Sequence, residues 1–327
     1  MSDNIQCIGV LTSGGDAPGM NAAIRAVVRT AIFHKLQVIG VQQGYSGLID
    51  NKFIPLQSYS VSKIISLGGT FLKSSRCPAF YTPEGRIHAM ENLRNMGIDA
   101  LVVIGGDGSF RGAQMLIDEY GLPVVGVPGT IDNDIYGTDF TIGFDTAINT
   151  AVQAIDKLRD TADSHNIVFF VEVMGRDAGF IALHSSIASG AEATLMPEVR
   201  TDIHKLCAYL EQDRRKNKTS GIVIVAEGEE QGSAAEVADK VKKILPDYDT
   251  RVTTLGHIQR GGSPSCNDRV LASVLGYEAV CALLDGKSGV MVGQQNGAVV
   301  YTPFQEACTR HNQINKKWNE IAYVLSL

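Results

Sequence analysis

The stretch Leu101-Val-Val-Ile-Gly-Gly-Asp-Gly-Ser109 joins a short apolar run to a turn with three glycines and one acid. The apolar run is typical of a buried strand, and the following residues repeat at helical spacing: Phe110, Ala113, Leu116 and Ile117. Such a turn exposes backbone N–H groups to an anion at the positive end of the helix dipole. Asp107 would repel a phosphate unless a divalent cation lay between them. The stretch therefore predicts either a site for a metal-bound polyphosphate or a tight turn without a ligand.

Strand-like and helix-like runs alternate along the whole chain, which predicts an α/β fold with parallel sheets. The predicted strands are 5–11, 38–41, 101–104, 124–127, 167–174 and 221–226. Helices are predicted from near Asn21, over 144–158, and from a cap at Asn267-Asp268 to about Leu284, where Asp285-Gly286 ends the last one. The 327 residues suffice for two lobes or for one large α/β unit.

Composition and charge exclude several classes of partner. The formal net charge is −6, which gives no basic field for nucleic acid, and no apolar run approaches the ~20 residues that span a bilayer. The first residues, Met1-Ser-Asp-Asn4, lack the cations of a signal peptide. The six cysteines show no C-x-x-C spacing, and Cys7 falls in a predicted strand, so we expect reduced thiols in a cytoplasmic protein.

Two further segments also follow predicted strands. Thr12-Ser-Gly-Gly-Asp-Ala-Pro-Gly-Met-Asn21 has neither the Walker nor the dinucleotide spacing, but its glycines equally permit close backbone approach. Two such turns favour a nucleotide site. Val127-Pro-Gly-Thr-Ile-Asp-Asn-Asp134 places two carboxylates where α/β sheets hold ligands. These carboxylates suit the binding of a metal ion or of a hydroxyl group, although a solvated acidic loop has the same composition.

Two more segments combine an arginine with glycines: Val173-Met-Gly-Arg-Asp-Ala-Gly179 and Leu255-Gly-His-Ile-Gln-Arg-Gly-Gly262. A guanidinium beside close-lying backbone can reach a phosphate. Taken singly, Arg176 or Arg260 reads as a surface ion-pair partner, and His257 as an ordinary hydrogen-bonded histidine.

Together the five segments resemble the bacterial-type ATP-dependent 6-phosphofructokinases from about Ile8 to the C-terminal region. The resemblance implies two Rossmann-like, three-layer α/β lobes with mostly parallel sheets and the active site in the cleft between them. The larger, ATP-binding lobe would comprise 1–141 and about 258–305, and the smaller, sugar-phosphate lobe 142–257 and about 306–327. The family forms homotetramers, so the resemblance implies this assembly too.

The implied reaction transfers the γ-phosphoryl group of MgATP to the 1-hydroxyl of fructose 6-phosphate in glycolysis. Asp132 matches the catalytic base, and Arg176 with Mg²⁺ would stabilise the transition state, with Asp107 as the metal ligand. The residues that match ATP-binding positions are Gly15, Arg76, Cys77, Gly106, Asp107, Gly108 and Ser109. Those that match sugar-phosphate positions are Thr130 (also catalytic), Ile131, Asp132, Met174, Gly175, Arg176, Glu227, Arg251, His257, Ile258, Gln259 and Arg260.

Two glycines bear on the phosphoryl donor, and one residue departs from the family at the acceptor site. Pyrophosphate-using members typically have Asp at the position of Gly108 and Lys at that of Gly129, so both positions here favour ATP. Ile167 replaces an Arg that usually reaches the sugar phosphate of a neighbouring subunit. We therefore expect weakened affinity for fructose 6-phosphate or a somewhat different acceptor.

The family's effector site binds ADP or phosphoenolpyruvate through basic residues, which here match Arg25, Arg29, Arg159, Lys216 and Lys218. Ser58 stands where an Arg is usual and Lys63 where an Asp is usual, so either the bound anion has changed or regulation has been lost. Other readings of the chain are a pyrophosphate-dependent or altered-acceptor sugar-phosphate kinase and a catalytically weak regulatory subunit. A lipid or NAD kinase shares only the Gly-Gly-Asp-Gly turn.

Overall fold

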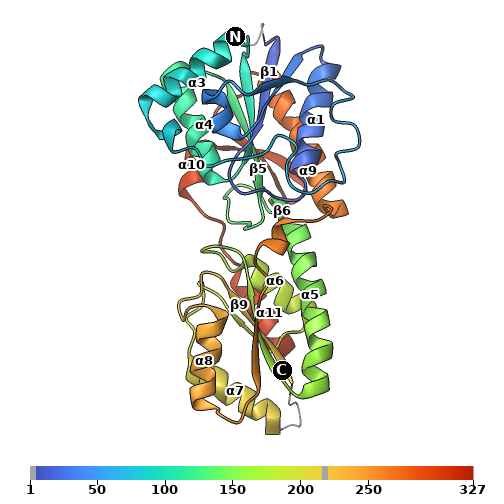
Figure 1. Cartoon of the computed structure of the whole chain (residues 1–327), viewed down its shortest axis with the longest axis vertical. Helices are drawn as coiled ribbons and strands as arrows, with labels where there is room; N and C mark the ends of the chain where they lie inside the picture. Colours follow the sequence, from blue (N-terminus) through green and yellow to red (C-terminus); the bar gives the residue numbers. More distant parts are fainter. Residues whose placement is uncertain (1–4, 216–219, 327) are drawn as a thin grey trace. The chain divides into compact units, whose positions relative to one another are not determined.

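The computed structural model describes residues 5–215 and 220–326, and the chain divides into two compact units. The first comprises Met1–Ile131, Ile135–Thr146 and Arg260–Asn312, and the second comprises Asp132–Asp134, Ala147–Gln259 and Gln313–Leu327. Each unit is built on a mostly parallel sheet with helices packed against it (Figure 1). The predicted α/β class is therefore confirmed.

In the first unit, eight strands of the described residues form one sheet in the order β12-β11-β5-β4-β1-β2-β3, with β6 beside β5. Only the β2–β3 and β11–β12 pairs of this sheet are antiparallel, within the part of the chain that the structure describes. Its elements are β1 (Cys7–Thr12), α1 (Met20–Phe33), β2 (Gln37–Val41), α2 (Gly44–Ile49), β3 (Phe53–Pro55), η1 (Pro78–Tyr81), α3 (Pro83–Asn95), β4 (Ala100–Gly105), α4 (Asp107–Tyr120), β5 (Val124–Thr130), β6 (Ile142–Gly143), α9 (Cys266–Leu284), β11 (Val290–Gln295), β12 (Ala298–Pro303) and α10 (Phe304–Thr309).

The second unit has a four-stranded parallel sheet, in the order β10-β7-β9-β8 among the described residues. Its elements are α5 (Phe144–His165, which begins in the first unit), β7 (Val168–Val173), α6 (Phe180–Ser189), β8 (Ala193–Leu195), α7 (Ile203–Arg215), β9 (Gly221–Ala226), α8 (Ala234–Ile244), β10 (Thr250–Thr254), η2 (Gly256–Arg260) and α11 (Lys316–Ser326).

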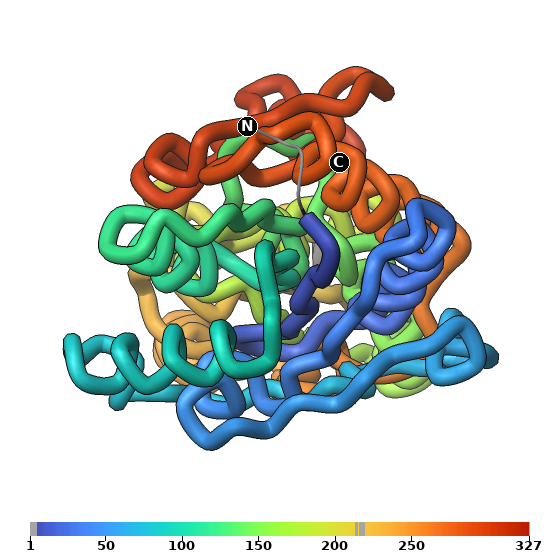
Figure 2. Tube along the Cα trace, turned by 90° about the horizontal axis from the view of Figure 1, so that it is seen from above, coloured from blue at the N-terminus to red at the C-terminus, as the bar shows by residue number. Residues whose placement is uncertain are grey.

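The central strands of the first sheet are buried along their whole length, because helices cover the sheet on both faces. β1 runs through the middle of this unit with helices to either side of it (Figure 2). On one face α1 and α9 pack side by side, and on the other α4 packs against α10 (Figure 1). Cys7 is buried in this core, as predicted. No helix in the described ranges is long and apolar enough to cross a membrane.

Three predicted helix boundaries need correction. The helix predicted over 144–158 continues to His165 as α5. α9 is capped by Ser265, whose hydroxyl accepts a hydrogen bond from Asp268 N (3.2 Å), and not by Asn267-Asp268. Asp268 instead lies in the first turn, where its buried carboxylate accepts hydrogen bonds from Gly143 N and Thr146 N, both 2.8 Å away. Asp107 was predicted within a turn, but it is the first residue of α4, with Gly106 at the N-cap. The predicted end of α9 at Leu284 is confirmed.

Candidate active site

Three strands of the first unit end at the same edge of its sheet. β1, β4 and β5 are neighbours and parallel, with Thr12 opposite Ile104 and Gly105 opposite Pro128. The two glycine turns therefore leave the sheet side by side, and the segment with Thr130 follows from the next strand. This edge is where parallel α/β sheets bind their ligands.

Close packing requires glycine where the first two turns meet. Ser13 N donates a hydrogen bond to Ile104 O at 2.9 Å. A Cβ atom on Gly105 would lie 2.5 Å from both Ser109 Oγ and Ser13 O, which is closer than real Cβ contacts allow. Gly14 has a φ of 85°, a left-handed conformation that favours glycine.

The N-terminus of α4 faces open space. Gly106 precedes this 14-residue helix without a side-chain cap, so the first backbone N–H groups of the helix are available to a ligand. A Cβ atom at Gly106 or Gly108 would meet nothing within 4 Å. The helix dipole and the free N–H groups together favour an anion such as a phosphate.

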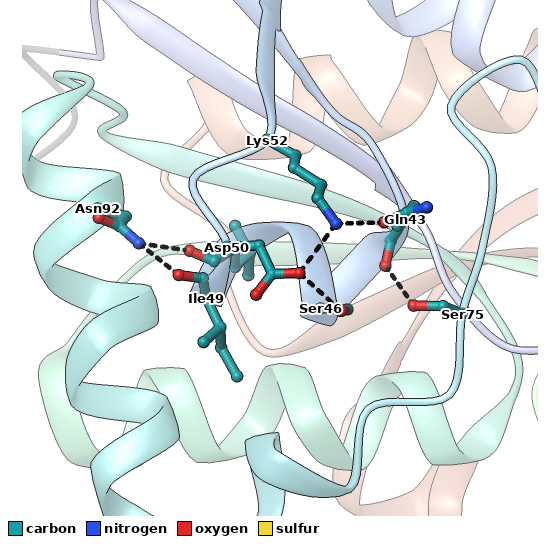
Figure 3. Close-up of polar contacts among 8 residues, drawn as sticks. Gln43, Ser46, Ile49, Asp50, Lys52, Ser75 and Asn92 are labelled. Carbon is teal, nitrogen blue, oxygen red and sulfur yellow. Dashed lines mark hydrogen bonds and ion pairs between the residues drawn. The ribbon is translucent and has the colours of Figure 1, made fainter.

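The segment with Arg76 and Cys77 is tied to the same turns. Ser74 Oγ donates to Gly14 O at 2.6 Å. Ser75 Oγ donates to Gln43 O at 3.0 Å (Figure 3). Lys52 Nζ in turn donates to Gln43 Oε1 at 2.7 Å, next to Asp50 (Figure 3). The structure thus brings together the residues predicted to bind the nucleotide: Gly15, Arg76, Cys77, Gly106, Asp107, Gly108 and Ser109.

Tyr45 supports this cluster and was missed at the sequence level. Its hydroxyl donates to Ser109 O at 2.5 Å, and its ring lies 4.2 Å from that of Phe80, centroid to centroid. Burial raises the pKa of Tyr45 above its ordinary value. A Cβ atom on Gly112 would lie 3.0 Å from the Tyr45 ring. In the sequence, the one local sign of this contact is Gly112, because a glycine inside a helix suggests that another group packs closely against it.

Asp107 has one carboxylate oxygen engaged by the protein. Its Oδ2 accepts a hydrogen bond from Arg111 Nη2 at 2.6 Å, while no hydrogen bond to Oδ1 occurs among the described residues. Within the same ranges, no group of three or more His, Cys, Asp or Glu residues could hold a metal ion. A single carboxylate beside a phosphate-binding turn fits Mg²⁺, which kinase sites hold through one or two carboxylates plus substrate phosphates.

Asp132 follows β5 by two residues, in a short segment that clusters with the second unit. Its side chain is only 3% exposed. Thr130 ends β5, and Thr141 Oγ1 donates to its carbonyl oxygen at 2.7 Å. Ile131, also predicted to bind the sugar phosphate, is completely buried, backbone included.

In the second unit, loops from the ends of β7 and β9 carry predicted sugar-phosphate residues. Arg176 N donates to Glu227 Oε2 at 3.2 Å, and Glu227 N donates to Val173 O at 2.9 Å. Arg176 adopts a φ of 53°, and its carbonyl oxygen would lie 2.2 Å from a Cβ atom on Gly228. Met174, Gly175, Arg176 and Glu227 are therefore brought together, with the Arg176 side chain exposed.

The η2 turn at the end of β10 presents its residues in different directions. His257 and Ile258 are exposed, whereas Gln259 is completely buried and donates from Nε2 to Gly256 O at 3.0 Å. Gln259 thus stabilises the turn. Arg260 belongs to the first unit, where its Nη1 donates to Asp16 O at 3.2 Å. A Cβ atom on Gly15 would lie 2.6 Å from the same Nη1.

Arg251 and Ile167 lie away from these loops. Arg251 is in β10, three residues before its end, and pairs with Asp249. Ile167 precedes β7 and is buried, and the next residue, Val168, pairs with Thr250. Both positions are therefore near the amino-terminal edge of this sheet, the opposite end of β7 from Arg176.

The predicted effector residues are differently placed. Arg25 and Arg29 lie on one face of α1, where burial and the charge of Arg29 lower the pKa of Arg25. Arg159 is held within the second unit by Glu192 Oε1 (3.2 Å) and the carbonyl oxygens of Ser189 and Gly190. The structure shows Ser58 and Lys63 as exposed. Lys216 and Lys218 lie outside the described residues.

This geometry defines an α/β protein whose glycine-lined strand edge is suited to phosphoryl groups. Comparison with known proteins makes the assignment specific. The sequence profile of the phosphofructokinase family matches residues 7–283. An ATP-dependent 6-phosphofructokinase 2 of Bacteroides thetaiotaomicron is 53% identical over 323 residues, 99% of both chains. An ATP-dependent 6-phosphofructokinase 1 of Thermus thermophilus is 55% identical over 98% of this chain and 99% of its own.

Solved structures agree with this result. Pichia pastoris phosphofructokinase in the T-state superposes with a TM-score of 0.88 at 36% identity, over 99% of this chain and 36% of that longer chain. A pyrophosphate-dependent phosphofructokinase from Marinobacter aquaeolei, 24% identical with a TM-score of 0.84, shares the fold. The chain belongs to the phosphofructokinase family.

Proposed function

We propose that the protein transfers the γ-phosphoryl group of MgATP to the 1-hydroxyl of fructose 6-phosphate, giving fructose 1,6-bisphosphate and ADP in the cytoplasm. The observation that carries this proposal is the gathering of the two glycine turns and the Arg76-Cys77 segment at one sheet edge. Relatives with 52–55% identity over nearly the whole chain bear the name ATP-dependent 6-phosphofructokinase, which supports ATP and this sugar phosphate as substrates.

The first unit would hold the donor. Backbone N–H groups at the N-terminus of α4 would bind phosphate oxygens, and Gly106 and Gly108 leave room for the nucleotide. Asp107 would hold Mg²⁺, which neutralises charge on the phosphates when bound. The exposed Arg76 and half-buried Cys77 would contact the rest of ATP.

Asp132 and Arg176 would act on the acceptor and the transferring group. A carboxylate is a weak base for an alcohol, but phosphoryl transfer has a loose transition state in which the hydroxyl keeps its proton until late. Asp132 therefore mainly orients the 1-hydroxyl and finally accepts its proton. The exposed Arg176 guanidinium would stabilise charge on the transferring phosphoryl group.

The sugar 6-phosphate would be bound by cations from more than one copy of the chain. About 17–20 Å separates the two ends of a six-residue strand such as β7. Arg251 and position 167 therefore suit the site of a neighbouring copy better than that of their own chain, which supports an assembly of copies such as the homotetramer that the resemblance implies. His257 and Arg260 would bind the phosphate from the same chain as Arg176. Arg25 and Arg29 would form part of an ADP or phosphoenolpyruvate site.

A steady-state assay with purified protein tests this proposal. Fructose 6-phosphate is varied with saturating MgATP, with pyrophosphate as alternative donor and related sugar phosphates as alternative acceptors. We expect fructose 1,6-bisphosphate with ATP only. Because Asp132 acts in the transition state, Asp132→Ser should lower kcat by a few powers of ten with a far smaller change in KM. Near-normal kcat in that variant, or no bisphosphate from the unaltered protein, would contradict the proposal.

A further inference from the structure

We propose that Arg111 is a positioning residue that holds the Asp107 carboxylate in its metal-binding orientation. This inference rests on the proposed function, in which Asp107 is the ligand of the nucleotide-bound metal. Arg111 lies one helical turn after Asp107 in α4, and its Nη2 is 2.6 Å from Asp107 Oδ2.

The same guanidinium nitrogen fastens the pair to a second helix. Arg111 Nη2 also donates to the carbonyl oxygen of Cys308, near the end of α10, at 3.1 Å. Cys308 Sγ in turn lies 3.4 Å from the carbonyl oxygen of Asp107. α4 and α10 pack closely around the stacked rings of Phe110 and Phe304. Arg111, itself held by the Cys308 carbonyl, therefore connects the Asp107 carboxylate to a closely packed part of the core.

The position of Asp107 explains why such an anchor is needed. An ionised carboxylate in the first turn of a helix is attracted to the free N–H groups of that turn. These are the groups that a phosphate of the nucleotide would need. By holding Oδ2, Arg111 keeps the carboxylate off the N–H groups and leaves Oδ1 for the metal. Side chains that orient metal ligands in this way typically change metal affinity by 10–100-fold when they are removed.

A thermodynamic cycle separates orientation of the metal ligand from contact with the nucleotide. Binding of ADP is measured by calorimetry in EDTA and again with saturating Mn²⁺, and the ratio of the two affinities is the metal-dependent gain. Asp107→Asn gives the gain without the metal ligand. We expect Arg111→Met to reduce the gain by about tenfold while metal-free ADP binding changes much less. Arg111→Lys, which restores one donor, should recover most of the gain.

A second surface pair supplies the matched control. Arg310 and Glu306 in and after α10 have the same four-residue spacing, with Nη1 3.2 Å from Oε2, and Arg310 has the same 55% exposure as Arg111. Arg310→Met should leave the gain unchanged. Circular dichroism shows whether each variant is folded as the unaltered protein is. Electron paramagnetic resonance records the spectrum of the bound Mn²⁺ in each variant.

Three results would overturn the proposal. A gain that stays the same or rises in Arg111→Met would show that Arg111 does not orient Asp107. An equal loss of affinity in EDTA and in Mn²⁺ would show that Arg111 contacts the nucleotide itself. No gain in the unaltered protein would remove Asp107 as metal ligand, and the assay with fructose 6-phosphate would then decide separately whether the proposed activity stands.

Discussion

Gly108 and Gly129 share a residue type but have different surroundings. A Cβ atom on Gly108 would meet nothing within 4 Å, because the position borders the open space at the start of α4. Gly108→Asp should therefore fold normally but set a carboxylate against the phosphates of ATP. We expect KM for ATP to rise by about two powers of ten with little change in Tm. Unchanged KM for ATP would show that the nucleotide does not pass over this position.

Gly129 lies inside β5, where a Cβ atom would be 3.0 Å from Met20 Cε and 3.2 Å from Ile104 Cγ2. Gly129→Lys must therefore push apart packed side chains. We expect it to destabilise the protein by about 1–3 kcal/mol, measured by denaturant unfolding. A stable Gly129→Lys variant would mean that the strand moves more easily than its packing indicates.

At the scale of elements, one ion pair connects α3, α4 and η1. Arg86 Nε and Nη2 bind both carboxylate oxygens of Glu119, at 2.8 and 2.7 Å, while Nη1 donates to the carbonyl oxygens of Phe80 and Tyr81. Since η1 directly follows Arg76 and Cys77, this buried guanidinium holds the end of the nucleotide segment in place. The hydrogen bonding and the charge of Arg86 lower the pKa of Glu119 below its ordinary 4.5.

The lowered pKa of Glu119 predicts a pH-dependent contribution to stability. The native state binds this proton more weakly than the unfolded chain, so the contribution is present above pH 4.5 and is lost as pH falls through the native pKa. Glu119→Gln should reduce stability at pH 7 by at most about 1 kcal/mol and have a smaller effect near pH 3. The free energy of unfolding, measured in urea at both pH values, tests this prediction. The control is Glu306→Gln, which removes the carboxylate charge from the exposed Arg310–Glu306 pair. An equal loss at both pH values would indicate a packing effect instead of the ion pair.

The elements that sequence patterns predict well are those whose burial is uniform. The apolar runs that became β1, β4, β5, β7 and β9 were predicted because both faces of a parallel sheet are covered. β10 was missed because Thr250-Arg-Val-Thr-Thr254 is a partly exposed edge strand with no apolar run. The β11–β12 hairpin was also missed, although Asn296-Gly297, both at positive φ, is a recognised hairpin signal.

The same distinction applies to the candidate site. Glycine turns after strands identified the nucleotide segments. A position where the backbone must come close to a ligand needs glycine, and glycine can be recognised from a short stretch of sequence. Tyr45 could not be found this way, since its contact with Ser109 spans 64 positions. The anchoring of Arg111 by Cys308 spans 197 positions. Supporting residues of this kind depend on which elements pack together, which no single segment encodes.

At the scale of the whole molecule, the amino-terminal edge of the second sheet is the least expected feature. Arg251 and Ile167 lie there together, at the opposite end of β7 from the loop with Arg176. Within an assembly such an edge can supply cations to another copy. Position 167, where the resemblance implies an Arg in the family, carries an apolar, buried side chain here, so we expect one cation fewer at that edge.

Ile167→Arg should restore the missing cation. A long arginine side chain can keep its stem in the apolar site of Ile167 while its guanidinium reaches out to a phosphate. A charge-assisted hydrogen bond contributes about 1.5–3 kcal/mol, so KM for fructose 6-phosphate should fall by roughly one to two powers of ten with kcat little changed. Ile167→Met, which keeps the apolar contact, is the matched control and should leave KM as it is. Because the added cation would act between copies, the lowering of KM should disappear when the protein is diluted until it dissociates into monomers. Sedimentation velocity would identify the concentration at which this happens. An unchanged KM in an assembled Ile167→Arg protein would show that position 167 takes no part in sugar-phosphate binding.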